Sequence, residues 1–205
     1  MKITKIEKSK HKQERVLVYT EEGDLLRITE HELLQFGLYT GMELSEELAE
    51  ALIASAAKSQ RRAYAVRVAS SRMLSQKELR DKLKRRNAAE EEATETAEWL
   101  AGLGAVDDAA YAGVIVRHYA AMGYGAGRVE QELYRRGIPK ELWEGALTQL
   151  PDPAEAVEAF LRSKLKEKPL DRDSSRKLAA ALQRRGFSWN DIRPVLNKLG
   201  QEIEE

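Results

Sequence analysis

The residues best suited to chemistry in this chain are arginines that occur in adjacent pairs. Each pair closes a short amphipathic segment and is followed by Asn or Gly, as in Arg85-Arg86-Asn87, Arg135-Arg136-Gly137 and Arg184-Arg185-Gly186. Guanidinium groups bind phosphates and carboxylates through paired hydrogen bonds, so each pair could hold an anionic partner. The same charges also suit the negative end of a helix dipole, which needs no partner. Both interpretations stay open for every pair.

Positive charge is densest around the first pair. Residues 58–86 carry 11 basic and two acidic side chains, whereas the whole chain has a net charge of zero. Such a window favours an anionic partner, although the glutamates at 90–92, 95 and 98 could neutralise it internally. We expect partner or DNA contacts from Arg61, Arg62, Arg67, Arg72, Lys82, Lys84, Arg85, Arg86, Arg128, Arg135, Arg136, Arg184 and Arg185.

The other polar motifs predict structure rather than catalysis. Asp107 and Asp108 point apart on a helix and have no third ligand nearby, so one of them is expected to cap that helix. The glycines of residues 123–127 follow a helix and lack the Lys-Ser/Thr of a phosphate loop, which predicts a flexible turn with Tyr124 packed across it. The three histidines are isolated, and there is no cysteine. We expect no enzyme activity, no metal and no cofactor.

The elements that position the arginine pairs are repeated. Leu83, Leu133 and Leu182 hold the same place in each amphipathic segment, 50 and 49 residues apart. A period near fifty in helical segments indicates stacked helical repeats, and therefore a mainly α, elongated array. Capping signals divide the helical part into three units of three helices, residues 58–104, 105–151 and 152–205. Individual helices are expected to start at Ser75, Pro139, Pro153, Ser174 and Ser188. The last helix is expected to end at Gly200. Tyr111 and the three tryptophans, Trp99, Trp143 and Trp189, are expected in the core, the tryptophans between repeats.

Residues 1–57 predict a different kind of module. Three short β-rich segments, around residues 3–6, 16–19 and 25–28, flank a hairpin turn at 21–24 and a polar, mobile stretch at 8–15. Thr29 with Glu32 forms a capping box, and Ser45 caps a long helix that is expected to break near Ser59. We place a domain boundary near Ala57. The first residues lack the apolar core of a signal peptide, and no run is long enough to span a membrane, so a cytoplasmic protein is expected.

The central repeat resembles the RecX family of bacterial regulators of the RecA recombinase. The matching residues are Asp107, Asp108, Tyr111, Gly123, Tyr124, Gly125, Leu133 and Gly137, and Ser75-x-x-Glu78-Leu79 resembles the motif of the family's first repeat. The resemblance covers about residues 60–205. It implies a curved array of three-helix repeats that lies in the groove of the RecA–DNA filament and lowers ATP hydrolysis and strand exchange during recombination and repair.

Two other functions stay open. A helical-repeat protein could bind single- or double-stranded DNA directly, without a recombinase partner. A protein–protein scaffold could carry the basic window as a solvated surface. In each case the chain is expected to be a monomer.

Overall fold

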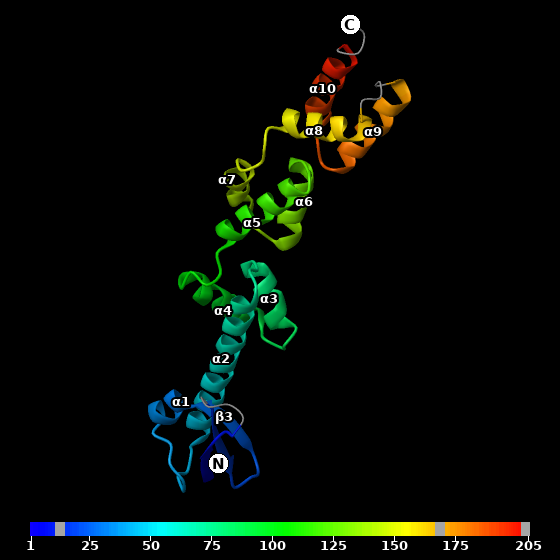
Figure 1. The fold of residues 1–205 in the computed structure, drawn as a ribbon. Helices are drawn as coiled ribbons and strands as arrows, with labels where there is room; N and C mark the ends of the chain where they lie inside the picture. The colour runs from blue at the N-terminus through cyan, green and yellow to red at the C-terminus, as the bar shows by residue number, and fades with distance from the viewer. Residues whose placement is uncertain (11–14, 167–170, 202–205) are drawn as a thin grey trace. The chain divides into compact units, whose positions relative to one another are not determined.

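The computed structural model describes residues 1–10, 15–166 and 171–201, and these form a mainly helical protein with one small sheet (Figure 1). Two compact parts are distinguished. One comprises residues 1–71 and 80–100, and the other residues 72–79 and 101–205. Each part is described by itself below. In the described residues, no helix is long and apolar enough to cross a membrane.

The N-terminal residues form a three-stranded antiparallel sheet, as predicted. Its strands are β1 (Ile3–Lys8), β2 (Arg15–Thr20) and β3 (Leu25–Thr29), in that order across the sheet. The turn between β2 and β3 places Gly23 at φ +90°, a conformation that favours glycine. Ile3, Val18 and Ile28 are fully buried and form the core of this module. The stretch expected to be mobile, residues 8–15, begins at the last residue of β1 and ends at the first residue of β2, and its residues 11–14 lie outside the described residues.

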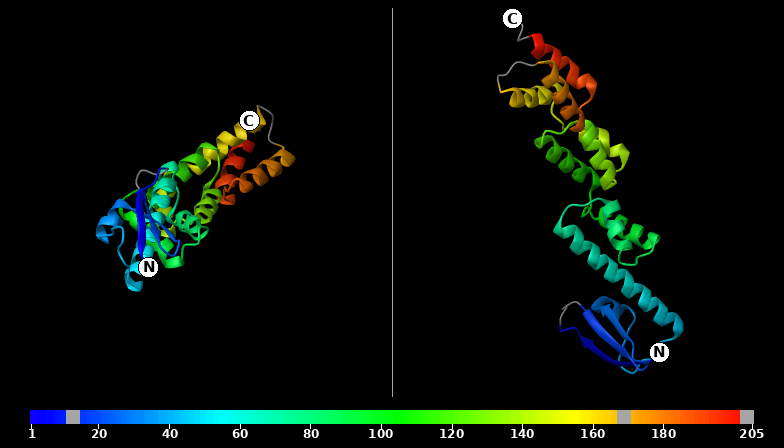
Figure 2. Two further views of the ribbon diagram at one scale, coloured as in Figure 1. Left: turned by 90° about the horizontal axis from the view of Figure 1, so that it is seen from below. Right: turned by 90° about the vertical axis from the view of Figure 1, so that its right-hand side faces the viewer.

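The sheet packs against two helices, α1 (Glu30–Gln35) and α2 (Glu46–Ser71). The capping box of Thr29 and Glu32 is confirmed, and Ser45 Oγ accepts a hydrogen bond from the amide of Leu48. The break expected near Ser59 is wrong, because α2 runs on without interruption (Figure 2). Ser59 instead donates its hydroxyl hydrogen to Glu32, which is buried against this helix. The boundary proposed near Ala57 therefore falls inside a continuous helix.

Three helical repeats follow the sheet, and this part of the predicted fold is confirmed. The first repeat consists of α2, α3 (Gln76–Lys84) and α4 (Glu90–Gly102). The second consists of α5 (Asp108–Ala121), α6 (Ala126–Arg136), and a 3-10 turn η1 (Lys140–Leu142) that leads into α7 (Trp143–Leu147). The third consists of α8 (Pro153–Leu165), α9 (Arg172–Arg184) and α10 (Trp189–Gln201).

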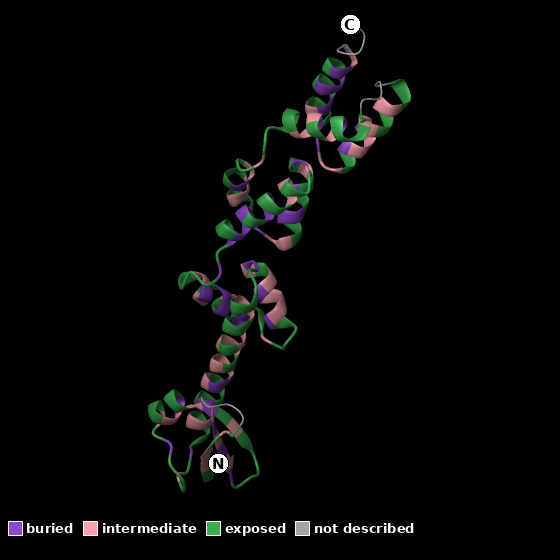
Figure 3. Cartoon of the chain, viewed as in Figure 1, coloured by how far each residue is buried: buried purple, intermediate pink, exposed green. Residues whose placement is uncertain are grey.

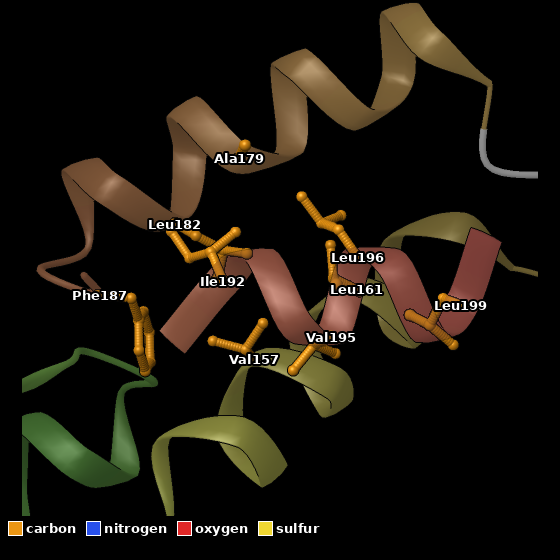
Figure 4. Close-up of a cluster of buried hydrophobic side chains, with 9 residues drawn as sticks. All are labelled: Val157, Leu161, Ala179, Leu182, Phe187, Ile192, Val195, Leu196 and Leu199. Carbon is orange, nitrogen blue, oxygen red and sulfur yellow. The ribbon is translucent and has the colours of Figure 1, made fainter. Parts of the chain in front are cut away.

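The repeated leucines lie where their spacing predicted. Leu83, Leu133 and Leu182 are each at most 1% exposed, and buried segments alternate with exposed ones along the helices (Figure 3). In the third repeat, Leu182 of α9 and Ile192 of α10 point toward Leu161 and Val157 of α8 (Figure 4). The left-handed residues that end the second helices are also confirmed, with φ of +63° at Asn87, +69° at Gly137 and +89° at Gly186.

Several local predictions need correction. Asp171, not Ser174, caps α9, because its carboxylate accepts a hydrogen bond from the Ser174 amide. Gly200 lies inside α10, which continues to Gln201. Pro139 precedes the 3-10 turn instead of occupying a first α-helical turn.

The tryptophans do not all anchor cores. Trp143 packs in the second repeat and donates its indole N–H to the Ile138 carbonyl. Trp99 is half-buried beneath the guanidinium of Arg62, at 4.5 Å from the ring centroid. Trp189 is 49% exposed, so its expected place in a core between repeats is wrong. A surface tryptophan at a helix start has the same sequence signature as a buried one.

Candidate partner-binding surface

The end of α6 is organised around Glu132, a carboxylate that is only 5% exposed. Arg135 Nη2 and Arg136 Nε bind its Oε1 at 2.5 and 2.7 Å. The hydrogen bond from Arg135 is the largest influence on Glu132 and, with Arg136, it outweighs burial and lowers its pKa to about 2. Arg136 also donates to the hydroxyl of Tyr111, which is buried as expected. Arg136 therefore holds the second repeat together.

A joint forms where the first turn of α3 meets the end of α6. Ser75 caps α3 as predicted, in a capping box with Glu78, and its hydroxyl also donates to the Arg136 carbonyl at 2.5 Å. Asp107 caps α5 as expected, through the amide of Ala110. Asp108 has a role that the sequence did not suggest, because its buried carboxylate accepts a hydrogen bond of 2.9 Å from the backbone amide of Gln76. It caps a helix 32 residues away.

A second joint forms where the first turn of α6 meets the end of α9. The Gly125 amide donates to the Arg185 carbonyl at 2.8 Å, and the Gly127 amide donates to the Gly186 carbonyl at 3.0 Å. A side chain at Gly125 would place a Cβ 2.8 Å from the Gly186 oxygen. The glycines thus allow two backbones to touch, and the flexible turn expected at residues 123–127 is a packed joint. Tyr124 lies across it, 5.5 Å from the Tyr119 ring.

The second arginine of each pair contacts its own chain. Arg136 binds Glu132, and Arg185 Nη1 donates to the Met122 and Gly123 carbonyls at 3.0 and 3.1 Å. Arg86 stacks on the ring of Tyr64 at 4.4 Å. The first arginine of each pair is exposed, with 67% of the Arg135 side chain accessible. Exposed first arginines thus recur on three equivalent helices, although Arg135 is also bonded to Glu132 and Arg86 is exposed as well.

The glutamates of α4 neutralise part of the basic window. Glu95 pairs with Lys58 at 2.5 Å and with Arg62 at 3.7 Å. Glu92 pairs with Arg61 at 2.9 Å, and Glu90 pairs with Lys84, also at 2.9 Å. Internal neutralisation, which the sequence left as an alternative, thus accounts for these four cations.

The remaining basic residues are more available. Within the described ranges, no carboxylate lies within 4.0 Å of Arg67, Lys82, Arg85 or Arg86. Lys82 and Arg85 are three residues apart at the end of α3, so they share one side of it. Arg128 and Arg184 are exposed, and Arg128 donates a hydrogen bond to Gln131. Arg72 lies 4.0 Å from Glu78.

Sequence reasoning missed three residues that border Arg135. A cavity of about 470 Å³ there is lined by Lys77, Lys140 and the 72% exposed Tyr134. An aromatic ring among cations is a common feature of interfaces. The adjacency of Tyr134 to Arg135 at the end of a helix was the signal available in the sequence.

Models of three helical domains match this chain. They describe the first, second and third three-helix domains of RecX and align with residues 62–100, 107–147 and 152–196. The arginine pairs and both joints lie within or beside these ranges.

Individual relatives and solved structures agree with the domain models. Regulatory protein RecX of Bacillus licheniformis is 31% identical over 209 residues, covering 99% of this chain and 79% of its own. Regulatory protein RecX of Xanthomonas campestris is 36% identical over 121 residues, which cover 58% of this chain and 75% of its own length. A crystal structure of regulatory protein RecX superposes with a TM-score of 0.75 at 27% identity, over 96% of this chain and 98% of that chain. The crystal structure of RecX from Lactobacillus salivarius superposes with a TM-score of 0.62 at 25% identity, over 69% of this chain and 96% of that chain.

Proposed function

Because this chain belongs to the RecX family of regulatory proteins, we propose that it binds the RecA–DNA filament and lowers recombinase activity. Family membership implies RecA regulation in general. The protein would act as a cytoplasmic, monomeric, non-catalytic regulator of recombination and DNA repair, because its work is done by binding.

The observation that carries the proposal is the exposed first arginine at the end of each second helix. Arg85, Arg135 and Arg184 are equivalent in the three repeats and are all exposed, and 67% of the Arg135 side chain stays accessible although it pairs with Glu132. A helical polymer presents the same acidic or phosphate groups again and again along its length. Repeated cations can therefore engage repeated sites, and the linkage of weak contacts converts them into avidity.

Direct DNA binding without a recombinase is the second candidate function. It is favoured by Lys82 and Arg85, which have no carboxylate partner among the described residues, since phosphate contacts need only exposed positive charge. The two functions differ in salt dependence. Binding through several phosphates weakens steeply as salt rises, whereas a packed protein interface weakens less.

Charge reversal at Lys82 and Arg85 tests the proposal. Lys82→Glu with Arg85→Glu changes the local charge by four without touching a residue that carries an ion pair. We expect the affinity for ATP-bound RecA filaments to fall by about tenfold or more, with the largest loss at low salt where screening is weakest. Co-sedimentation measures this affinity, and RecA ATP hydrolysis measures inhibition.

The matched control is Glu91→Lys with Glu98→Lys, which changes as much charge on exposed positions of α4. Naked single- and double-stranded DNA are run alongside the filaments. Unchanged filament binding by a folded Lys82/Arg85 variant would contradict the basic-surface mechanism. Equal binding to naked DNA and to filaments would favour the second function.

A further inference from the structure

A cavity of about 390 Å³ lies in the first compact part, and four arginines line it. Arg15 comes from the first residue of β2, Arg61 and Arg67 come from α2, and Arg86 follows the end of α3. The module and the first repeat thus contribute to one site. Arg15 lies outside the basic window, and no sequence pattern pointed to it.

Two guanidinium nitrogens at this cavity are buried without a hydrogen-bond partner in the described part of the chain. They are Nη1 of Arg15 and Nε of Arg61. A buried N–H group without an acceptor is unfavourable, and native proteins satisfy nearly all such groups. An anion in the cavity would bring acceptor oxygens to the side of both arginines.

The charge around the cavity calls for an anion. Glu92 is the carboxylate among the lining residues, and it is bonded to Arg61. Four guanidinium groups against one carboxylate leave an excess of three positive charges. Arg67 and Arg86 lie at 5.5 and 4.4 Å from the centroid of the Tyr64 ring, so the ring helps to hold them beside each other. Stacked guanidinium groups keep their in-plane N–H groups for an acceptor.

The other two repeats explain why this helix end is available. The end of α6 is covered by Ser75, and the end of α9 is covered by Gly125 and Gly127. Each covering residue belongs to the start of the preceding repeat's second helix. In the described residues the sheet module stands before the first repeat, and the corresponding residues Arg86 and Asn87 line the cavity.

We propose that this arginine pocket, formed by Arg15, Arg61, Arg67 and Arg86, binds a nucleotide phosphate, either free or within a strand. A phosphate offers several acceptor oxygens and, as a monoester, close to two negative charges, which matches converging guanidinium forks better than one carboxylate does. The cavity also falls in the range of roughly 300–1,000 Å³ typical of small-ligand sites. The site would work in the protein alone and does not depend on RecA.

Calorimetric titration of the full chain tests the pocket. The probes are inorganic phosphate, ATP and a short oligothymidylate, each at low salt and without RecA. We expect Arg15→Gln with Arg67→Gln to weaken binding of the probe by about tenfold or more, because both remove donors from the pocket. Arg61→Gln alone is a second variant, and thermal melting checks that each protein is folded.

The control is Lys2→Gln with Arg27→Gln, which removes the same charge from exposed positions of the same compact part and lies outside the pocket lining. Binding of ATP and phosphate that is lost only in the pocket variants supports a free nucleotide as the source. Binding of the oligonucleotide alone, lost in the same variants, supports a strand phosphate. Absence of binding by the wild type, or equal loss in pocket and control variants, would overturn the proposal.

Filament co-sedimentation of these proteins and of the Lys82→Glu/Arg85→Glu variant separates the two proposals. Unchanged filament binding by the Lys82/Arg85 variant would contradict the proposed basic-surface function and would not affect the pocket proposal. Unchanged probe binding by the pocket variants would contradict the pocket proposal alone.

Discussion

Glu132 illustrates how one residue can organise a repeat. Its carboxylate is almost fully buried and is bound by both arginines that follow it on α6. Those arginines were candidate partner contacts in the sequence, and the structure divides their tasks. Arg136 is 26% exposed and tied to Glu132 and Tyr111, whereas Arg135 keeps most of its surface accessible.

The low pKa of Glu132 predicts a pH-dependent contribution to stability. Its pKa falls from 4.5 to about 2 on folding, so the charged form stabilises the native state above about pH 4.5. That contribution is lost as the pH falls from about 4.5 to about 2. The shift corresponds to at most about 3 kcal/mol, and exposure of Arg135 reduces it toward about 1–2 kcal/mol.

Urea denaturation between pH 7 and pH 2 checks this prediction. The difference in unfolding free energy between wild type and Glu132→Gln should be largest at pH 7 and should shrink through the acid range. The control is Glu130→Gln, an exposed position on the same helix. A difference between wild type and Glu132→Gln that does not change with pH would contradict the assignment.

At the scale of elements, the two joints have one design. The start of one second helix lies on the end of the next, at α3 on α6 and at α6 on α9. Gly137 and Gly186 occupy the acceptor ends in the left-handed conformation. A Cβ on Gly137 would lie 2.0 Å from Lys77 Cδ, and a Cβ on Gly186 would lie 2.2 Å from the Arg128 nitrogen. Close approach therefore adds a second requirement for glycine.

Gly186→Ala should loosen the α9 joint. The substitution carries the left-handed penalty of about 1–2 kcal/mol, and the clash with the Arg128 backbone adds to it because backbone cannot yield as a flexible side chain can. Gly104→Ala is the matched control, since Gly104 also has positive φ (+69°) but nothing within 4 Å of its Cβ. We expect faster hydrogen exchange at the Gly125 and Gly127 amides in the Gly186 variant and not in the Gly104 variant. Equal melting temperatures for both would refute a packed joint.

At the scale of the whole molecule, the N-terminal sheet and the first repeat share α2. Leu52 and Ala56 of this helix belong to the core of the sheet, while Arg61 and Arg62 pair with α4. Residues 1–57 carry 7 basic and 11 acidic side chains, so the module supplies little of the positive charge. We therefore expect the module to adjust binding, through Arg15, more than it provides the main contacts.

Deletion of residues 1–44 tests this role. The deletion keeps the Ser45 cap and all of α2. Because the deletion would expose Leu52, which packs in the core of the sheet, Leu52→Gln is added to replace that apolar side chain. The repeats should stay helical by circular dichroism. Filament affinity should fall no further than it does when Arg15 alone is replaced by Gln in the intact chain. Loss of all filament binding in a helical truncation would show that the module supplies the main site.

The sequence by itself determined the helices, the repeats and most caps. Leu83, Leu133 and Leu182 repeat at helical positions, and Ser75 with Glu78 and Ser188 with Asp191 form capping boxes as expected. These features are local, because periodicity and capping depend on residues three to four apart. The family resemblance then identified the three-helix repeats, and the domain models agree with it.

Only the tertiary structure decided which polar residues are available to a partner. Arg185 is held by carbonyls 62 and 63 residues away, Asp108 caps a helix in the preceding repeat, and Arg15 meets Arg86 at one cavity. An adjacent arginine pair has the same local signature whether a member faces solvent, a carboxylate or a neighbouring helix end. The difference lies in contacts between segments distant in sequence, which local spacing does not encode.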